Sequence, residues 1–321
     1  MILVTGGAGF VGTHTVRALL DLGETCVVTR WPAEPGPDFS FVHQAEIGRR
    51  IFIEDLDISE RGAFLALGER HAITGIIHLA LPGIGVLDLF DDFRVTTLGL
   101  LNILEAAHQW GVPRVSIASS IAVYLGVAET PLREDTPLPM RADESYGAIK
   151  KSFELLAAAI ALDAKFEVIN MRISPTWGPL YHSMEQLPSR MVHAAVKGES
   201  TYFAPPRRPV YEEDGIDMPY VKDTARGIAL LQLAPQLKYR TYNVGSGRMT
   251  KKKDLLAAIK AVIPDTKFSL LEGHAPTSKP SQYTFYGDIS RIHEDTGYAP
   301  EYDVARGVAE YIEWLRSGHD Y

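Results

Sequence analysis

The first twelve residues constrain the fold of this chain more than any other segment. An apolar, β-branched run at 2–5 leads directly into Gly6, Gly9 and Gly12, and a segment with helical periodicity follows. In such a strand–turn–helix unit the first glycine permits the tight turn, the second lets a pyrophosphate approach the backbone, and the third lets the helix pack on the strand. The N–H groups at the start of the helix would then face the phosphates. The segment therefore predicts a dinucleotide-binding unit.

Strand and helix patterns alternate along the chain to about residue 172. Short apolar runs predict strands near 2–5, 25–29, 51–54, 74–79, 114–118 and 167–172. Apolar residues at three- and four-residue spacing predict helices near 10–22, 60–70, 87–110 and 144–163. The order predicts an α/β fold with a doubly wound parallel sheet, the Rossmann arrangement, built from two βαβαβ halves.

Prolines become frequent beyond residue 172, and the regular alternation stops. Because proline is confined mainly to sheet edges and turns, we expect a smaller, loop-rich C-terminal substrate lobe. Within it we predict a short strand and helix at 218–233, a strand at 241–244 and a helix at 252–262. The expected division is a dinucleotide-binding domain at 1–172, completed by about 218–245, and a substrate-binding lobe at 173–217 and 246–321.

Composition narrows the partners and the compartment. The 321 residues include 32 basic and 40 acidic side chains, so the net charge is −8 and no basic surface for nucleic acid is expected. The start of the chain lacks the features of a signal peptide, and no apolar run reaches the roughly 18 residues of a membrane helix. We therefore expect a cytoplasmic protein that binds neither membrane nor nucleic acid. With one cysteine, Cys26, and no His-x-x-x-His spacing, no metal site is expected.

The end of the second predicted strand bears on which dinucleotide binds. In NAD sites a carboxylate about twenty residues after the glycines binds the ribose 2′-hydroxyl, but here Arg30 takes that place and the next carboxylate is Glu34. An arginine can pair with the 2′-phosphate of NADP, so NADP is favoured over NAD. An Arg30 that stacks on adenine or points into solvent would leave the choice open. Asp57, after the third strand, is placed to bind the adenine amine or to cap the next helix.

Three polar residues predict the chemistry. Tyr146 and Lys150 are four residues apart in a predicted helix, so they project from one face. A tyrosine has a pKa of about 10, and a close ammonium lowers such a pKa by about 1 to 3 units, which would make Tyr146 a general acid/base. Ser120 ends the fifth strand, at the sheet edge that lines the ligand crevice. We expect it to hold the substrate oxygen.

The chain resembles the extended short-chain dehydrogenase/reductases, in the group usually called the NAD-dependent epimerase/dehydratase family. The resemblance rests on the segments 5–12, 78–80, 119–124, 146–150, 242–247, 288–291 and 297–300. It implies that Ser120, Tyr146 and Lys150 form the catalytic triad, that Lys150 also holds the nicotinamide ribose, and that the loop after Ala80 lies along the cofactor. It also implies a homodimer paired through the helices near 87–110 and 144–163. Burial inside one subunit would explain the apolar residues of those helices equally well.

These arguments define the candidate site residues. The expected cofactor-binding residues are Gly6, Gly9, Phe10, Val11, Gly12, Arg30, Asp57, Ile58, Leu79, Ala80, Leu81, Ala118, Tyr146 and Lys150. The expected substrate residues flank the crevice or lie in the lobe: Leu81, Pro82, Ser120, Ser174, Thr176, Trp177, Tyr181, His182 and Arg208.

Some of these candidates have a second interpretation. Trp177 and Tyr181 are suited to stack on a ring of the substrate or to fill the core. Arg207 and Arg208 would bind a carboxylate or phosphate, or lie at the surface. His78 ends an apolar strand and is expected to be a hydrogen-bonded structural residue.

Several positions depart from the sugar-nucleotide enzymes that the chain resembles. Ile121 and Ala122 stand where the dehydratases carry an Asp-Glu pair, and these side chains cannot transfer protons, which argues against dehydration. Pro175 replaces an asparagine that commonly binds the substrate diphosphate, and it offers no N–H. Thr96 replaces an asparagine, and Ile216 replaces an arginine, at other positions that face the diphosphate in those enzymes. We therefore expect a small-molecule substrate other than a large sugar nucleotide.

Three hypotheses about function follow. The first is an NAD(P)-dependent oxidoreductase that interconverts a secondary alcohol and a ketone on a small polyol, sugar acid or similar carbonyl compound. The alternative is a sugar or nucleotide-sugar epimerase with tightly bound NAD, which would purify with its dinucleotide and show no net change in nicotinamide absorbance. A further alternative is a non-catalytic dinucleotide-sensing protein, but a sensor has no need of Ser120, Tyr146 and Lys150.

Overall fold

A parallel sheet organises the computed structural model, which describes residues 1–31, 39, 43–83, 86–141, 144–200, 209–267, 270–276 and 284–321. Over these residues seven strands pair in the order β3-β2-β1-β4-β5-β6-β8, and every pairing is parallel. The strands are β1 (Ile2–Thr5), β2 (Cys26–Arg30), β3 (Ile51–Asp55), β4 (Gly75–His78), β5 (Arg114–Ser120), β6 (Glu167–Ile173) and β8 (Thr241–Val244). The strand order reverses between β1 and β4, so the predicted doubly wound sheet is confirmed.

Helices cover both faces of this sheet, which explains why its central strands are apolar throughout. One face packs against α1 (Phe10–Asp21), α8 (Val221–Leu233) and α10 (Ser290–Thr296). The other packs against α3 (Arg61–Leu65), α4 (Leu67–Arg70), α5 (Leu89–Trp110) and α6 (Ser145–Asp163). The strands and helices predicted up to residue 172 are confirmed to within two residues at each end, except that the helix near 60–70 is two short helices.

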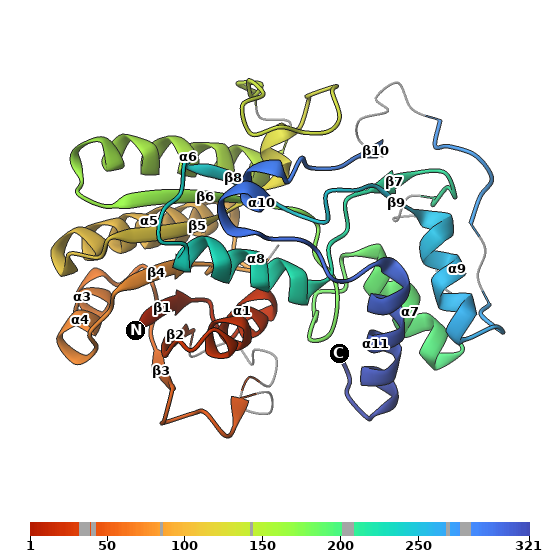
Figure 1. Cartoon of the computed structure of the whole chain (residues 1–321), viewed down its shortest axis with the longest axis horizontal. Coiled ribbons are helices and arrows are strands. Elements are labelled where there is room, and N and C mark those ends of the chain that lie inside the picture. The colour runs from red at the N-terminus through yellow and green to blue at the C-terminus, as the bar shows by residue number, and fades with distance from the viewer. Residues whose placement is uncertain are drawn as a thin grey trace.

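The C-terminal part contains more helix than the prolines suggested. Beside the main sheet, on the right in Figure 1, a three-stranded sheet pairs β7 (Gly215–Ile216) with β9 (Thr250–Lys251) and β10 (Thr284–Phe285). It lies with α7 (Leu187–Lys197), α9 (Lys252–Val262) and α11 (Val304–Arg316), which share a separate apolar core. The helices α7, α10 and α11 were not predicted, and the short strand is at 215–216 rather than after 218.

The missed helix α7 shows why proline misled the sequence interpretation. Pro188 lies in the first turn of α7. The first N–H groups of a helix have no partner within it, so a proline there costs nothing and its fixed φ favours the helix.

Within the described residues, none of the helices has both the length and the hydropathy needed to cross a lipid bilayer.

Candidate active site

The glycine-rich turn has the geometry that its spacing predicts. Gly6 has a φ of +66°, and a Cβ there would lie 2.8 Å from backbone atoms of Ala80. A Cβ on Gly12 would lie 2.1 Å from the carbonyl oxygen of Gly6, so only glycine allows α1 to approach the turn this closely. Gly9 is the N-cap of α1 and offers no side chain to the first N–H groups. The backbone cradle therefore fits a pyrophosphate.

A groove of about 320 Å³ leads away from this turn across the ends of β1, β2 and β3. Of the expected cofactor residues it is lined by Gly6, Gly9, Phe10, Val11, Gly12, Arg30, Asp57, Ile58, Leu79, Ala80 and Leu81. Pro82, expected to contact the substrate, lines this groove instead of the larger cavity described below. The Asp57 carboxylate accepts bonds from the backbone N–H and the hydroxyl of Ser59, at 2.8 and 2.7 Å, so it stabilises the turn before α3.

Arg30 is already paired within the protein. Its Nε and Nη2 donate to the two carboxylate oxygens of Asp55, at 2.7 and 2.9 Å. The two residues are register partners at the ends of β2 and β3. Each charge stabilises the other, which lowers the pKa of Asp55 and raises that of Arg30. The sequence interpretation considered phosphate, adenine and solvent as partners for Arg30 and missed this carboxylate.

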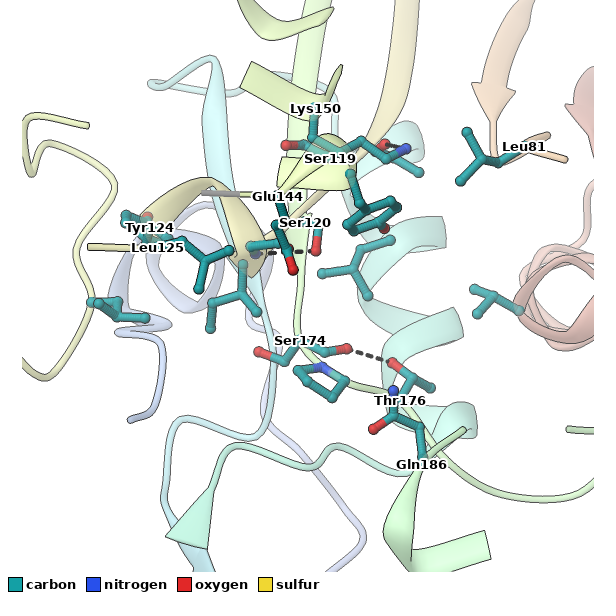
Figure 2. Close-up of a pocket in the computed structure, with 18 of the residues that line it drawn as sticks. Leu81, Ser119, Ser120, Tyr124, Leu125, Glu144, Lys150, Ser174, Thr176 and Gln186 are labelled. Atoms are coloured by element: carbon teal, nitrogen blue, oxygen red, sulfur yellow. Dashed lines mark hydrogen bonds between the residues drawn. The ribbon is translucent and has the colours of Figure 1, made fainter. Parts of the chain in front are cut away.

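A larger cavity of about 650 Å³ opens where β5 and β6 end (Figure 2). Its described lining includes Ser119, Ser120, Tyr146, Lys150, Ser174, Pro175, Thr176 and Tyr181, together with Ala118, Ile121, Ala122, Glu144, Gln186 and Phe285. Phe10, Val11, Leu79 and Leu81 line both the cavity and the groove, so the two hollows adjoin. The structure thus brings the three predicted catalytic residues together beside the glycine-rich cradle.

The pKa of Tyr146 differs from the expectation. Burial raises the pKa of Tyr146, and its interaction with the Ser120 hydroxyl opposes this rise only in part. The Lys150 ammonium lies 5.7 Å from the centre of the Tyr146 ring and donates to the carbonyl of Ala118 at 2.7 Å. Burial lowers the pKa of Lys150 to about 8, although the charges of nearby carboxylates act in the opposite direction. The predicted lowering of the Tyr146 pKa by Lys150 is therefore wrong, because desolvation dominates.

A buried polar network supports the wall behind the catalytic residues. The Ser119 hydroxyl donates to Glu154 at 2.5 Å, and the two carboxylate oxygens of Glu154 accept from Arg172 at 3.0 and 2.7 Å. Arg172 also donates to Tyr124 at 2.8 Å, and Tyr124 donates to Asn243 at 2.9 Å. These bonds link β5, α6, β6 and β8. Sequence reasoning missed Glu154, whose only signal was its position one turn after Lys150.

The family model for the NAD dependent epimerase/dehydratase family matches residues 2–245 of this chain. The chain belongs to this family. The predicted resemblance is thereby confirmed, and the relatives are enzymes, as the sequence suggested.

Among the curated relatives, the dTDP-glucose 4,6-dehydratase of Streptomyces griseus is 28% identical over 98% of this chain and 93% of its own length. The human UDP-glucose 4-epimerase is 29% identical over 98% of this chain and 96% of its own length. In solved structures, the Thermotoga maritima UDP-glucose 4-epimerase with UDP-glucose superimposes with a TM-score of 0.80 at 22% identity, covering 98% of both chains. MoeE5 in complex with UDP-glucuronic acid and NAD gives a TM-score of 0.75 at 25% identity, over 98% of this chain and 99% of the other.

The candidate substrate residues separate into two groups. Ser174, Thr176 and Tyr181 line the cavity, and the Tyr181 ring lies 4.8 Å from that of Phe10. The Ser174 hydroxyl is used within the protein, since it donates to the buried Asp217 at 3.0 Å. Trp177 was expected as a substrate contact, but it is 2% exposed and its indole N–H donates to the carbonyl of Met218. It fills the core of the lobe.

The remaining candidates lie away from the cavity or outside the described residues. His182 packs on the ring of Tyr321, with the centroids 4.4 Å apart. Arg207 and Arg208 lie outside the described residues. His78 is the structural residue that was expected: it is buried, bonds to the Thr5 hydroxyl at 2.7 Å, and has its pKa lowered to about 3 by desolvation.

Further residues line the cavity and were not predicted, among them Glu144, Gln186 and Phe285. Glu144 is the N-cap of α6, two residues before Tyr146, and Gln186 is the N-cap of α7. Phe285 belongs to β10. Figure 2 shows Glu144 and Ser120 in one part of the cavity and Gln186 and Thr176 in another. Over the described residues, no three His, Cys, Asp or Glu side chains gather as a metal ion would require.

Proposed function

We propose that this member of the family is an epimerase that inverts one carbinol carbon of a sugar or nucleotide sugar and retains NAD between turnovers. The observation that carries the proposal is the arrangement of Ser120, Tyr146 and Lys150 in one cavity that adjoins the glycine-rich groove. The curated relatives, which are nucleotide-sugar epimerases and dehydratases, support it over a free polyol dehydrogenase. The division into a dinucleotide-binding part and a substrate lobe, as set out above, belongs to the same proposal.

Tyr146 and Ser120 are the residues suited to handle the proton of the reacting hydroxyl. When bound, NAD would supply the hydride acceptor and donor. Tyr146 takes the proton of the reacting hydroxyl and later returns it, while Ser120 holds the oxygen by a hydrogen bond. Burial raises the pKa of Tyr146, which favours the phenol, the form that returns the proton to the substrate oxygen. Lys150, on the same face of α6, would hold the nicotinamide ribose.

The wall next to Ser120 argues against dehydration. Ile121 and Ala122 line the cavity and can neither protonate a leaving hydroxyl nor abstract a proton from carbon. In the dehydratases that the sequence resembles, these two positions carry an acid and a carboxylate. Oxidation followed by reduction needs neither group, which favours epimerisation.

The size of the cavity widens the substrate class beyond the expectation from the sequence. Pro175, which replaces a diphosphate-binding asparagine, lines the cavity. The volume of about 650 Å³ is nevertheless in the middle of the roughly 300–1,000 Å³ range of ligand pockets. Volume therefore admits a nucleotide sugar as well as a free sugar, and both belong in the first screen.

The test begins with the dinucleotide that the purified protein carries, released by denaturation and identified by mass spectrometry. The protein is then incubated with UDP- and dTDP-linked hexoses and with free hexoses, and the epimers are separated by chromatography. We expect interconversion of two epimers with no net change in nicotinamide absorbance, and none with Tyr146→Phe. Net NADH formation would support the dehydrogenase instead, and a keto-deoxy sugar product would overturn the exclusion of dehydration.

We also propose a homodimer through α5 and α6. Leu100, Ile103 and Leu104 of α5 are explained by burial inside the subunit. Other apolar residues of the two helices remain exposed, among them Phe90 at 77% and Leu162 at 85%. We expect Leu162→Arg to convert a dimer into a monomer in sedimentation velocity, whereas Leu22→Arg, at an exposed site of another face, leaves the dimer intact. A monomeric wild-type protein would contradict the proposal.

A further inference from the structure

The ends of β2 and β3 carry a charge arrangement that bears on which dinucleotide the groove accepts. We propose that Asp55, by holding Arg30 in an ion pair, selects NAD against NADP. The inference rests on the proposed use of the groove as the dinucleotide site. It reverses the preference for NADP that Arg30 alone suggested.

The pair lies at the ribose side of the predicted site. Arg30 lines the groove together with Thr29 and Trp31, and the Thr29 hydroxyl accepts a bond from the backbone N–H of Gly6 at 3.3 Å. The strand end that carries Arg30 is therefore tied directly to the glycine-rich turn. Arg30 lines the groove, and Asp55 holds it from the neighbouring strand without lining the groove itself; their side chains are 41% and 47% exposed.

Asp55 occupies part of the Arg30 guanidinium and offsets its charge. Nε and Nη2 form one of the forks with which a guanidinium can bind a phosphate bidentately, and both already donate to Asp55. The pair is neutral as a unit. Among the described residues that line the groove, Arg30 is the only cation, and Asp57 adds a negative charge. The nearby carboxylate of Glu54 does not change this balance, because it is paired with Arg70 and His71.

NADP and NAD differ in the charge that they bring toward the pair of Arg30 and Asp55. The 2′-phosphate of NADP carries a charge of about −1.5 to −2, as phosphate monoesters do at neutral pH, and would be repelled by the Asp55 carboxylate. The 2′-hydroxyl of NAD is neutral and meets no such repulsion. An Arg30 without Asp55 would instead present a free guanidinium to the phosphate. Discrimination thus comes from the repulsive group as much as from the attractive one.

The experiment compares the binding of NAD⁺ and NADP⁺ by calorimetric titration, in the wild-type protein and in Asp55→Asn. Any dinucleotide that purifies with the protein is first identified and removed, and its identity gives a second readout. We expect the wild type to bind NAD⁺ more tightly, and Asp55→Asn to shift the ratio of the two affinities toward NADP⁺ by about tenfold or more. The double variant Arg30→Ala/Asp55→Asn is expected to lose this shift, because the released guanidinium is its source.

A matched control separates the site from a general change of charge. Glu105 forms a similar exposed pair with Arg61, away from the groove, so Glu105→Gln alters the net charge equally and should leave the affinity ratio unchanged. A wild-type protein that prefers NADP⁺, or an Asp55→Asn variant with an unchanged ratio, overturns the inference. Neither result depends on epimerase activity: selective NAD⁺ binding without epimerisation would overturn the proposed function alone, and failure to bind either dinucleotide would overturn both.

Discussion

The two adjoining hollows of this protein are built in different ways. At one end of the groove the turn between β1 and α1 is backbone from one continuous segment, and neither Gly6 nor Gly12 leaves room for a Cβ. The cavity is made of side chains from distant segments, including Ser120 of β5, Tyr146 of α6 and Phe285 of β10. A local motif can therefore specify the glycine-rich end of the groove. The cavity depends on how segments far apart in the chain pack together.

The largest expected effect is a loss of turnover without a loss of NAD⁺ affinity, which distinguishes the cavity from the groove. Tyr146→Phe removes the proton-transfer group of the cavity but no part of the glycine-rich turn, so we expect turnover to fall by about a thousandfold. Affinity for NAD⁺ should change by no more than a few-fold. Epimer chromatography and calorimetry measure the two quantities. Tyr181→Phe, a second cavity phenol, is the matched control, and retained turnover in Tyr146→Phe would show that Tyr146 is not the acid/base.

A substitution in the glycine-rich turn should instead reduce stability and dinucleotide binding. In Gly12→Ala the new Cβ would lie 2.1 Å from the Gly6 carbonyl oxygen, so the turn must move. We expect the free energy of unfolding to fall by about 3 kcal/mol, as for a strained or overpacked site, and dinucleotide binding to be lost. Gly62→Ala is the control, since a Cβ in α3 would meet no atom within 4 Å and alanine favours a helix. Equal stability of the two variants would contradict the close approach of α1 to the turn.

The smallest effect compares two buried lysines, Lys150 in the cavity and Lys252 at the start of α9. Burial lowers the pKa of each to about 8. The unfolded chain keeps both protons up to about pH 10.4, so it binds more protons than the folded protein between these values. The cost of burying each charge is complete below pH 8 and disappears as the pH rises toward 10. The free energy of unfolding should therefore gain on the order of 2 kcal/mol per lysine over this range.

Urea unfolding at pH 8, 9 and 10 measures this gain. Lys150→Met and Lys252→Met should each have a smaller rise with pH than the wild type. If Lys150→Met keeps the full rise, the ammonium beside Tyr146 is better solvated than its surroundings indicate. The two variants then also show whether the cavity or the lobe is the drier of the two regions.

Sequence periodicity predicted the strands and helices of the main sheet but was not sufficient to predict the structure of the lobe. The strands and helices of the first 172 residues were predictable because each is a run whose apolar spacing repeats over several turns or alternations. In the lobe, Pro188 was interpreted as a loop signal, yet it begins α7. Trp177 was a plausible substrate contact, yet its ring is part of the core formed with Tyr220 and Tyr311. Neither outcome follows from the neighbours of these residues along the chain.

The sequence alone determined the features that depend on nearest neighbours along the chain. The turn at Gly6, the close packing at Gly12, and the placement of Tyr146 and Lys150 on one face of α6 follow from backbone geometry over a few residues. The tertiary structure decided the features that depend on distant partners. Arg30 meets Asp55 only because β2 and β3 are adjacent and in register. Similarly, the pKa of Tyr146 is set by burial, because the electrostatic environment of a group is the sum over all segments packed around it.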